Sequence, residues 1–172
     1  MSSSKPLAIL ALMLSLALGG CWLKPLYGPQ GGASGPVQID LASIDIVTDD
    51  DELDHILRNQ LANDLNPGGL TSVGEAFTLD VNPRESTNAL LIQLDDTISR
   101  FDLTVAADYT LRRRSDDRIV LRSSVRRVAS YNVVDDTYAT LVARRDAQRR
   151  ASAAVSRAIR TNLALYFRDE QT

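Results

Sequence analysis

The stretch FDLTVAADYTLRRRSDDRIVLRSSVRRVASY, residues 101–131, decides the fold of this chain. Its first part alternates, with an apolar residue at every second position from Phe101 to Leu111 and polar residues at most positions between them. Such alternation predicts a strand that buries one face and exposes the other to water. Residues 115–117 (Ser-Asp-Asp) predict a turn, after which residues 118–131 return as the second strand of a long hairpin.

Two further strands are predicted before this hairpin. Residues 37–47 (VQIDLASIDIV) alternate, with a slip at residues 42–43 that indicates a bulge. Residues 77–81 alternate in the same way, and strand character resumes over residues 88–94. Pro83 lies between these two runs and indicates an edge, a bulge or a turn at that place.

Two segments have the periodicity of helices. Leucine and isoleucine recur at helical spacing from Leu53 to Leu65, after acidic residues that suit the start of a helix. Residues 67–69 (Pro-Gly-Gly) end this helix. A longer helix is predicted over residues 137–167, with apolar residues on one face and arginines on the opposite face.

Together these elements predict an α+β fold in the order β-α-β-β-β-α. All apolar faces are buried in a two-layer sandwich, in which two helices pack on one face of a mostly antiparallel, four-stranded sheet. The first two strands are expected to be joined by a right-handed crossover through the first helix. A chain of 172 residues suits a single domain, which we expect to span residues 37–172.

The start of the chain predicts export. One positive charge at Lys5 precedes the run LAILALMLSLAL, residues 7–18. As a helix this run reaches only about 18 Å, well short of the ~30 Å hydrocarbon core of a membrane. Residues 1–20 are therefore interpreted as a signal peptide that is removed. The sequence Leu-Gly-Gly-Cys at residues 18–21 resembles a bacterial lipobox, whose cysteine receives a diacylglycerol group and, after cleavage, an N-acyl chain.

Cys21 is the only cysteine of the chain. The alternative to acylation is an ordinary exported protein with an unpaired thiol, which is a liability in an oxidising compartment. Residues 21–36 are rich in glycine and proline and are predicted to be an acylated tether. The cysteine is followed by Trp22, and not by the aspartate that commonly retains lipoproteins at the inner membrane. We therefore expect a lipid anchor in the outer membrane, with the domain facing the periplasm.

Catalytic and metal chemistry are not expected. With one cysteine and one histidine, His55, the chain lacks the ligands for a transition-metal site. The sequence contains no nucleophile elbow, zinc-protease motif, phosphate loop or dinucleotide fingerprint, so we predict that the protein is not an enzyme. The only non-protein groups expected are the acyl groups on Cys21, and no cofactor is predicted.

The net charge of −3 hides an uneven distribution. Acidic residues gather between residues 40 and 64, whereas arginines dominate residues 100–127 and 144–160. Basic surfaces bind nucleic acid, anionic lipid or acidic partners, and an exported lipoprotein does not ordinarily meet nucleic acid. Nucleic acid is therefore not an expected partner.

Four arginines gather at the predicted end of the hairpin: Arg112, Arg113, Arg114 and Arg118. Planar guanidinium groups suit phosphate and carboxylate groups. These four residues are candidate contacts for an anionic glycolipid. The alternative is a solvated hairpin end whose charge is balanced by the neighbouring aspartates.

Two stretches resemble the LPS-assembly lipoprotein family LptE, in its alphaproteobacterial branch. Mature members typically begin Cys-Gly-Phe-x-Pro-Leu-Tyr-Gly, and this chain has Cys-Trp-Leu-Lys-Pro-Leu-Tyr-Gly at residues 21–28. It departs from the pattern at Trp22 and Leu23. Residues 130–167 are similar to the closing strand and helix of the family, and the matching pieces are Tyr138-Ala139, Asp146-Ala147 and Leu163-Ala164-Leu165-Tyr166-Phe167.

This resemblance implies a lipoprotein that binds inside the LptD β-barrel, assists its assembly and helps deliver lipopolysaccharide to the outer leaflet. Lipopolysaccharide carries phosphates and carboxylates, which the hairpin arginines are suited to bind, although no family motif covers those positions. A rival hypothesis is an auxiliary lipoprotein of a phospholipid-trafficking ABC transport system. A plain structural lipoprotein is a third.

Overall fold

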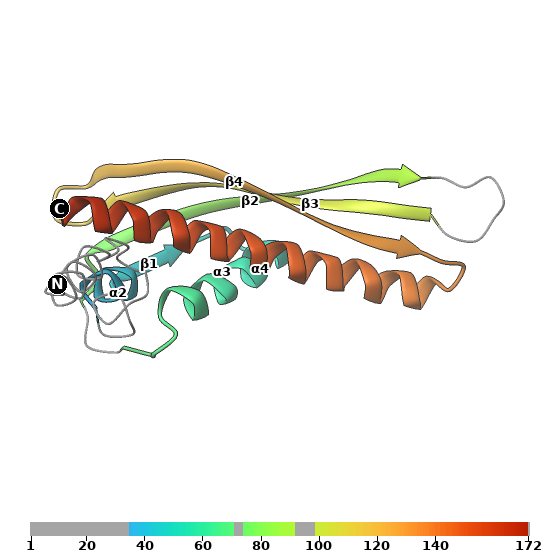
Figure 1. Cartoon of the computed structure of the whole chain (residues 1–172), viewed down its shortest axis with the longest axis horizontal. Coiled ribbons are helices and arrows are strands. Elements are labelled where there is room, and N and C mark those ends of the chain that lie inside the picture. The colour runs from blue at the N-terminus through green and yellow to red at the C-terminus, as the bar shows by residue number, and fades with distance from the viewer. Residues whose placement is uncertain (1–34, 71–73, 92–98, 172) are drawn as a thin grey trace, which may run out of the picture.

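The computed structural model describes residues 35–70, 74–91 and 99–171. In these residues three helices pack against a four-stranded sheet (Figure 1). In chain order the elements are α2 (Pro36–Ala42), β1 (Ile44–Val47), α3 (Glu52–Leu65), β2 (Phe77–Leu91), β3 (Ser99–Arg113), β4 (Arg118–Val133) and α4 (Thr137–Glu170). The predicted α+β class and the rough order of strands and helices along the chain are confirmed, with one helix more than predicted.

The sheet is mixed, and its strands lie in the order β1-β2-β3-β4. β1 runs parallel to β2 but pairs only with Phe77–Asp80, while β2–β3 and β3–β4 are antiparallel along almost their whole length. β2 passes through Pro83 without a break, because β1 has already ended there and Pro83 lies on an edge. The edge interpretation of Pro83 is therefore confirmed. β2 is described as far as Leu91, so the last residues of the predicted 88–94 strand lie outside the described residues.

The predicted hairpin is formed by β3 and β4. The alternation of β3 has the expected effect: five side chains on one face are almost completely buried, namely Leu103, Val105, Ala107, Tyr109 and Leu111. The buried hydroxyl group of Tyr109 accepts a hydrogen bond of 2.9 Å from Nδ2 of Asn162 on α4. This face of β3 therefore supplies the centre of the core without an unsatisfied phenol group.

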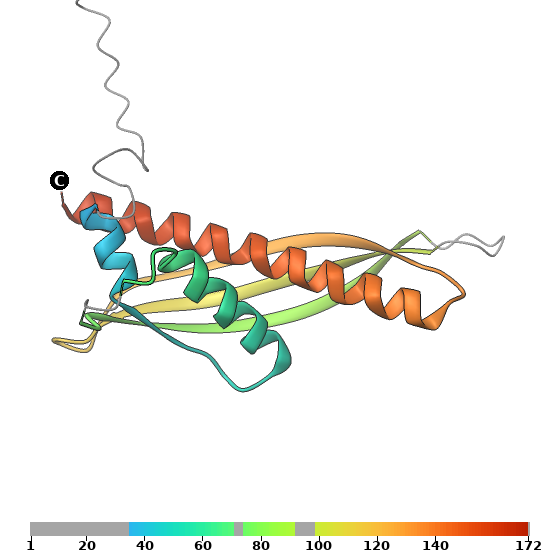
Figure 2. The same cartoon turned by 90° about the horizontal axis from the view of Figure 1, so that it is seen from below.

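α4 extends along the length of the sheet, whereas α3 covers only the part nearer to α2 (Figure 2). Val155, Ile159 and Leu163 of α4 are fully buried, and leucines of α3 pack into the same core. Ser156 Oγ donates a 2.6 Å hydrogen bond to the Asp64 carboxylate of α3. α4 begins at a cap, since the carboxylate of Asp136 accepts bonds from two backbone N–H groups of the first turn.

One prediction was wrong in detail, because residues 37–42 belong to α2 and not to a strand. Pro36 is the first residue of this helix, where its missing N–H group costs nothing. Gln38 and Leu41 lie on one buried face, and Gln38 Nε2 donates a 2.6 Å bond to the carbonyl of Leu65, at the end of α3. The slip at residues 42–43, interpreted as a bulge, is the end of this helix.

We predict that Leu163→Ala lowers the free energy of unfolding by about 2–5 kcal/mol, because it opens a cavity in a closely packed core. Leu163 has an exposed fraction of 0%. Leu165→Ala is the matched control, since this leucine of the same helix is 37% exposed and should cost much less. Urea unfolding of both variants, followed by circular dichroism, measures the difference. Equal losses would contradict the assigned core.

Candidate functional site

The four arginines selected from the sequence lie together at one end of the molecule. Arg112 and Arg113 end β3, Arg114 begins the turn and Arg118 begins β4. In the turn Asp117 has φ 54°, a left-handed conformation that aspartate tolerates better than most residues. The C-terminal end of α4 and helix α2 lie at the same end (Figure 1). The hairpin end is therefore next to the point where the chain enters the domain.

Arg112 and Arg113 are neutralised by nearby carboxylates. Arg112 Nη1 lies 3.2 Å from Asp117 Oδ2 inside the turn. Arg113 Nη2 lies 3.3 Å from Glu170 Oε1 of α4, and its Nη1 lies 3.7 Å from Asp116 Oδ2. The two turn aspartates thus balance the arginines as the alternative interpretation proposed, and the end of α4 adds a third carboxylate.

Arg114 has the most partners. Its Nη2 lies 2.7 Å from Asp45 Oδ2 on β1, and its Nη1 forms an ion pair with Glu75. Its Nε donates a 3.0 Å bond to Thr78 Oγ1 on β2, and its backbone N–H donates to the carbonyl of Ala76 at the same distance. One side chain therefore connects the hairpin end to β1, to the segment before β2 and to β2 itself.

This end of the molecule is an ion-pair network and not a cluster of one charge. Its four arginines lie among five carboxylates, which belong to Asp45, Glu75, Asp116, Asp117 and Glu170. Of the four, Arg118 is the one without an ion pair to any residue in the described ranges. A phosphate group would have to displace a carboxylate at each of the other three, so Arg118 is the arginine most available to an anion.

Partly buried groups complete this end. Burial raises the pKa of Tyr166, and a hydrogen bond with Glu170 raises it further. Burial also raises the pKa of Asp40 on α2, while a 2.9 Å hydrogen bond from Gln171 Nε2 acts in the opposite direction. The first contact lies within α4, and the second joins the C-terminal end of the chain after α4 to α2.

Two arginines in the first half of α4, Arg144 and Arg150, also have partners. Arg144 Nη2 lies 2.9 Å from Glu85 Oε1 on β2, and this contact raises the pKa of Arg144. Arg150 Nε lies 2.7 Å from Asp146 Oδ2 one turn earlier, and this hydrogen bond lowers the pKa of Asp146. The first contact attaches α4 to β2, and the second balances charge on the surface of the helix itself.

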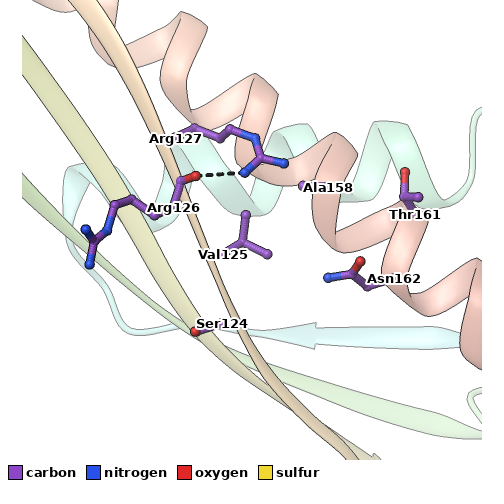
Figure 3. Close-up of a pocket in the computed structure, with 7 residues that line it drawn as sticks. All are labelled: Ser124, Val125, Arg126, Arg127, Ala158, Thr161 and Asn162. Carbon is purple, nitrogen blue, oxygen red and sulfur yellow. Dashed lines mark hydrogen bonds between the residues drawn. The ribbon is translucent and has the colours of Figure 1, made fainter.

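A second group of arginines was not predicted as a site. Arg122, Arg126 and Arg127 lie in the middle of β4, and none of them forms an ion pair within the ranges that the structure describes. A groove of about 310 Å³ lies beside Arg126 and Arg127, between β4 and α4 (Figure 3). Its α4 wall is formed by Ala158, Thr161 and Asn162. The signal in the sequence is that residues 118–133 contain no acidic residue.

Other predicted features fall partly outside the described residues. The predicted signal peptide, Cys21, Trp22 and most of the predicted tether lie outside the described residues. Among the described residues, no group of three or more histidine, cysteine, aspartate or glutamate side chains is arranged to hold a metal ion. Within the described ranges, no helix is both long enough and apolar enough to cross a membrane.

We predict that Arg114→Ala lowers the free energy of unfolding by about 1 kcal/mol, because it removes two partly exposed ion pairs and a hydrogen bond. Arg118→Ala is the matched control and should change it by less than about 0.5 kcal/mol. Urea unfolding at low and high salt measures both, and the Arg114 effect should shrink in high salt. The same loss in both variants would contradict the role assigned to Arg114.

No protein-family model matches the sequence, and no curated protein matches it. Solved structures do resemble it. A candidate lipoprotein from Caulobacter crescentus CB15 is 24% identical, with a TM-score of 0.64 over 78% of this chain and 96% of that chain. A minor lipoprotein from Acinetobacter baumannii is 13% identical, with a TM-score of 0.52 over 71% and 90%. Rare lipoprotein B from Shewanella oneidensis is 12% identical, with a TM-score of 0.48 over 75% and 98%. The first two comparisons show that this domain has the fold of proteins described as bacterial lipoproteins.

Proposed function

We propose that the protein is a lipid-anchored outer-membrane lipoprotein of the LPS-assembly type, which acts with an LptD-like β-barrel to deliver lipopolysaccharide to the outer leaflet. The observation that carries the proposal is that a lipobox-like segment and a lipoprotein-type fold occur in the same chain. A segment that resembles a lipobox and continues as Pro-Leu-Tyr-Gly precedes a domain whose fold occurs in bacterial lipoproteins. An export signal, an anchor and a periplasmic domain then follow one another along the chain.

The distance between the anchor and the domain supports an orientation. α2 begins at Pro36, fifteen residues after Cys21. A glycine-rich chain of this length has a mean end-to-end distance of about 20 Å. Because α2 lies beside the hairpin end, this end of the domain is the one held near the membrane (Figure 1). The hairpin arginines are then within reach of lipid headgroups.

The opposite end supports contact with a protein partner. α4 is 34 residues long, about 50 Å at 1.5 Å per residue, so the domain is elongated. Its first turns expose apolar side chains at helical spacing, with exposed fractions of 74% for Tyr138, 43% for Leu141 and 45% for Val142. Apolar side chains grouped on one exposed face are typical of an interaction surface. In this proposal they pack against the inner wall of the barrel.

We predict that the full-length, tagged chain fractionates with outer membranes and co-purifies with a large LptD-like β-barrel after detergent extraction. Cys21→Ser is the matched control, because it removes the acceptor for the acyl groups and should move the protein to the soluble periplasmic fraction. Membrane fractionation and mass spectrometry of the purified complex provide the measurement. Recovery of the wild-type protein without any β-barrel, even when both are overexpressed, would contradict the proposed partner.

Direct contact with lipopolysaccharide through Arg112, Arg113, Arg114 and Arg118 belongs to the same proposal. We predict that Arg118→Ser weakens binding of lipopolysaccharide about tenfold, the effect of losing one charge-assisted hydrogen bond. Arg84→Ser is the control, since Arg84 pairs with Asp108 at 3.1 Å elsewhere on the sheet. Titration with fluorescent lipopolysaccharide measures both affinities. An unchanged affinity of the Arg118 variant would remove the hairpin end as the glycolipid contact.

A further inference from the structure

Among the residues that the structure describes, β3 is the only strand paired with β4, so β4 has one edge without a strand partner there. Two of its carbonyl oxygens accept hydrogen bonds from side chains. The carbonyl of Arg126 accepts a 2.8 Å bond from the Arg127 side chain, and the carbonyl of Ser130 accepts a 3.1 Å bond from the Arg150 side chain. These carbonyls therefore point away from β3. Because backbone directions alternate along an antiparallel strand, the even-numbered residues from 122 to 132 present their N–H and C=O groups at the free edge.

This edge is long and accessible. β4 has 16 residues, and its even-numbered side chains from Arg122 to Asn132 are exposed except for the half-buried Ser130. In the described part of the chain, no hydrogen bond reaches the backbone N–H groups of these even-numbered residues from the outer side. Unpaired strand edges of this length are templates for the addition of another strand, and proteins usually shorten or cover them.

The side chains at the edge have one sign of charge. Figure 3 shows Arg126 pointing away from α4 and Arg127 extending on the side of α4. Because side chains alternate along a strand, Arg122 shares the face of Arg126. None of the three forms an ion pair within the described ranges, and β4 itself contains no acidic residue. Beside the strand, the small side chains Ala158 and Thr161 leave the groove between β4 and α4 open.

The positive charge along this edge discriminates between strands that could pair with it. Like charges directly opposite one another on paired strands are destabilising, so this basic edge opposes pairing with the same edge of a second copy. Opposite charges at cross-strand positions are stabilising, so the same arginines favour a strand that carries carboxylates. The guanidinium group of Arg127, which now binds the carbonyl of Arg126, belongs to an exposed side chain that can move to such a carboxylate at small cost. Arg150 binds the carbonyl of Ser130 and is also paired with Asp146, so its guanidinium group is held in place.

We propose that the free edge of β4 accepts an extended, acidic segment of a partner protein as a fifth strand of the sheet. Backbone bonds to the even-numbered residues supply the pairing. Carboxylates on alternate residues of the segment pair with Arg122 and Arg126, and side chains on its other face lie over the groove beside Arg127. This inference is independent of the delivery of lipopolysaccharide.

The test uses the full-length chain in detergent and a fluorescent peptide of alternating glutamate and threonine, about ten residues long, the upper range of ordinary strands. We expect this peptide to bind and a lysine–threonine peptide of equal length not to bind. The double variant Arg122→Glu, Arg126→Glu should lose affinity for the glutamate peptide by about tenfold or more and acquire affinity for the lysine peptide.

A second pair of variants separates strand addition from simple attraction between charges. Val128→Pro removes one outward N–H group and leaves the bonds to β3 in place, so it should abolish peptide binding, whereas Val128→Thr should retain it. In the wild-type chain, the peptide should slow hydrogen exchange at the even-numbered amides of residues 122–132. Three results would each overturn the proposal: no binding of the glutamate peptide, binding that survives Val128→Pro without protection of those amides, or protection that arises from self-association without peptide.

Discussion

Burial of one face of β3 beneath α4 is the contact on which the rest of the structure depends. Side chains from Leu103 to Leu111 on that face are excluded from water along the strand. A strand of 15 residues is about 50 Å long at 3.3 Å per residue, and a helix of 34 residues is about 50 Å long at 1.5 Å per residue. The two elements therefore match in length, which explains why a single helix covers the strand and why the domain is elongated.

The shorter elements make the two ends of this long core different. α3 has 14 residues, about 21 Å, and β1 has only four, so both support one half of the sheet. At that end Arg114 connects the hairpin to β1 and to β2, and α2 and the end of α4 pack together. The other end has no cover from α2 or α3 in the described residues (Figure 2) and exposes Tyr138 and its neighbours. In the proposed function, the first end faces the membrane and the second meets the partner.

The strong periodic signals in the sequence predicted the fold well. β3 and α4 were found because their alternation and helical repeat extend over many residues, and the turn between β3 and β4 was found from its aspartates. Residues 37–42 were misassigned because their short apolar alternation also suits a helix, and the bond from Gln38 to the carbonyl of Leu65 is a tertiary contact. Local patterns do not contain such contacts.

The candidate site was predicted only in part, for the same reason. The sequence placed four arginines at one hairpin end, and the structure confirms that they lie there. The partners of Arg114 at Asp45 and Glu75 are 69 and 39 residues away along the chain, so its neutralisation was not visible in the sequence. The arginines of β4 form no such pairs in the described residues, and only the order of the strands reveals that they line a free edge.

Depletion of the protein, followed by quantification of lipopolysaccharide at the cell surface, tests the proposed function most directly. Surface labelling with a lipopolysaccharide-specific probe, alongside measurement of phospholipids in the outer leaflet, separates the proposed function from its rivals. The proposal predicts that surface lipopolysaccharide falls as the protein is depleted and returns when the wild-type chain is restored. Unchanged surface lipopolysaccharide would contradict it, and altered phospholipid asymmetry in the same cells would favour a role in phospholipid trafficking instead.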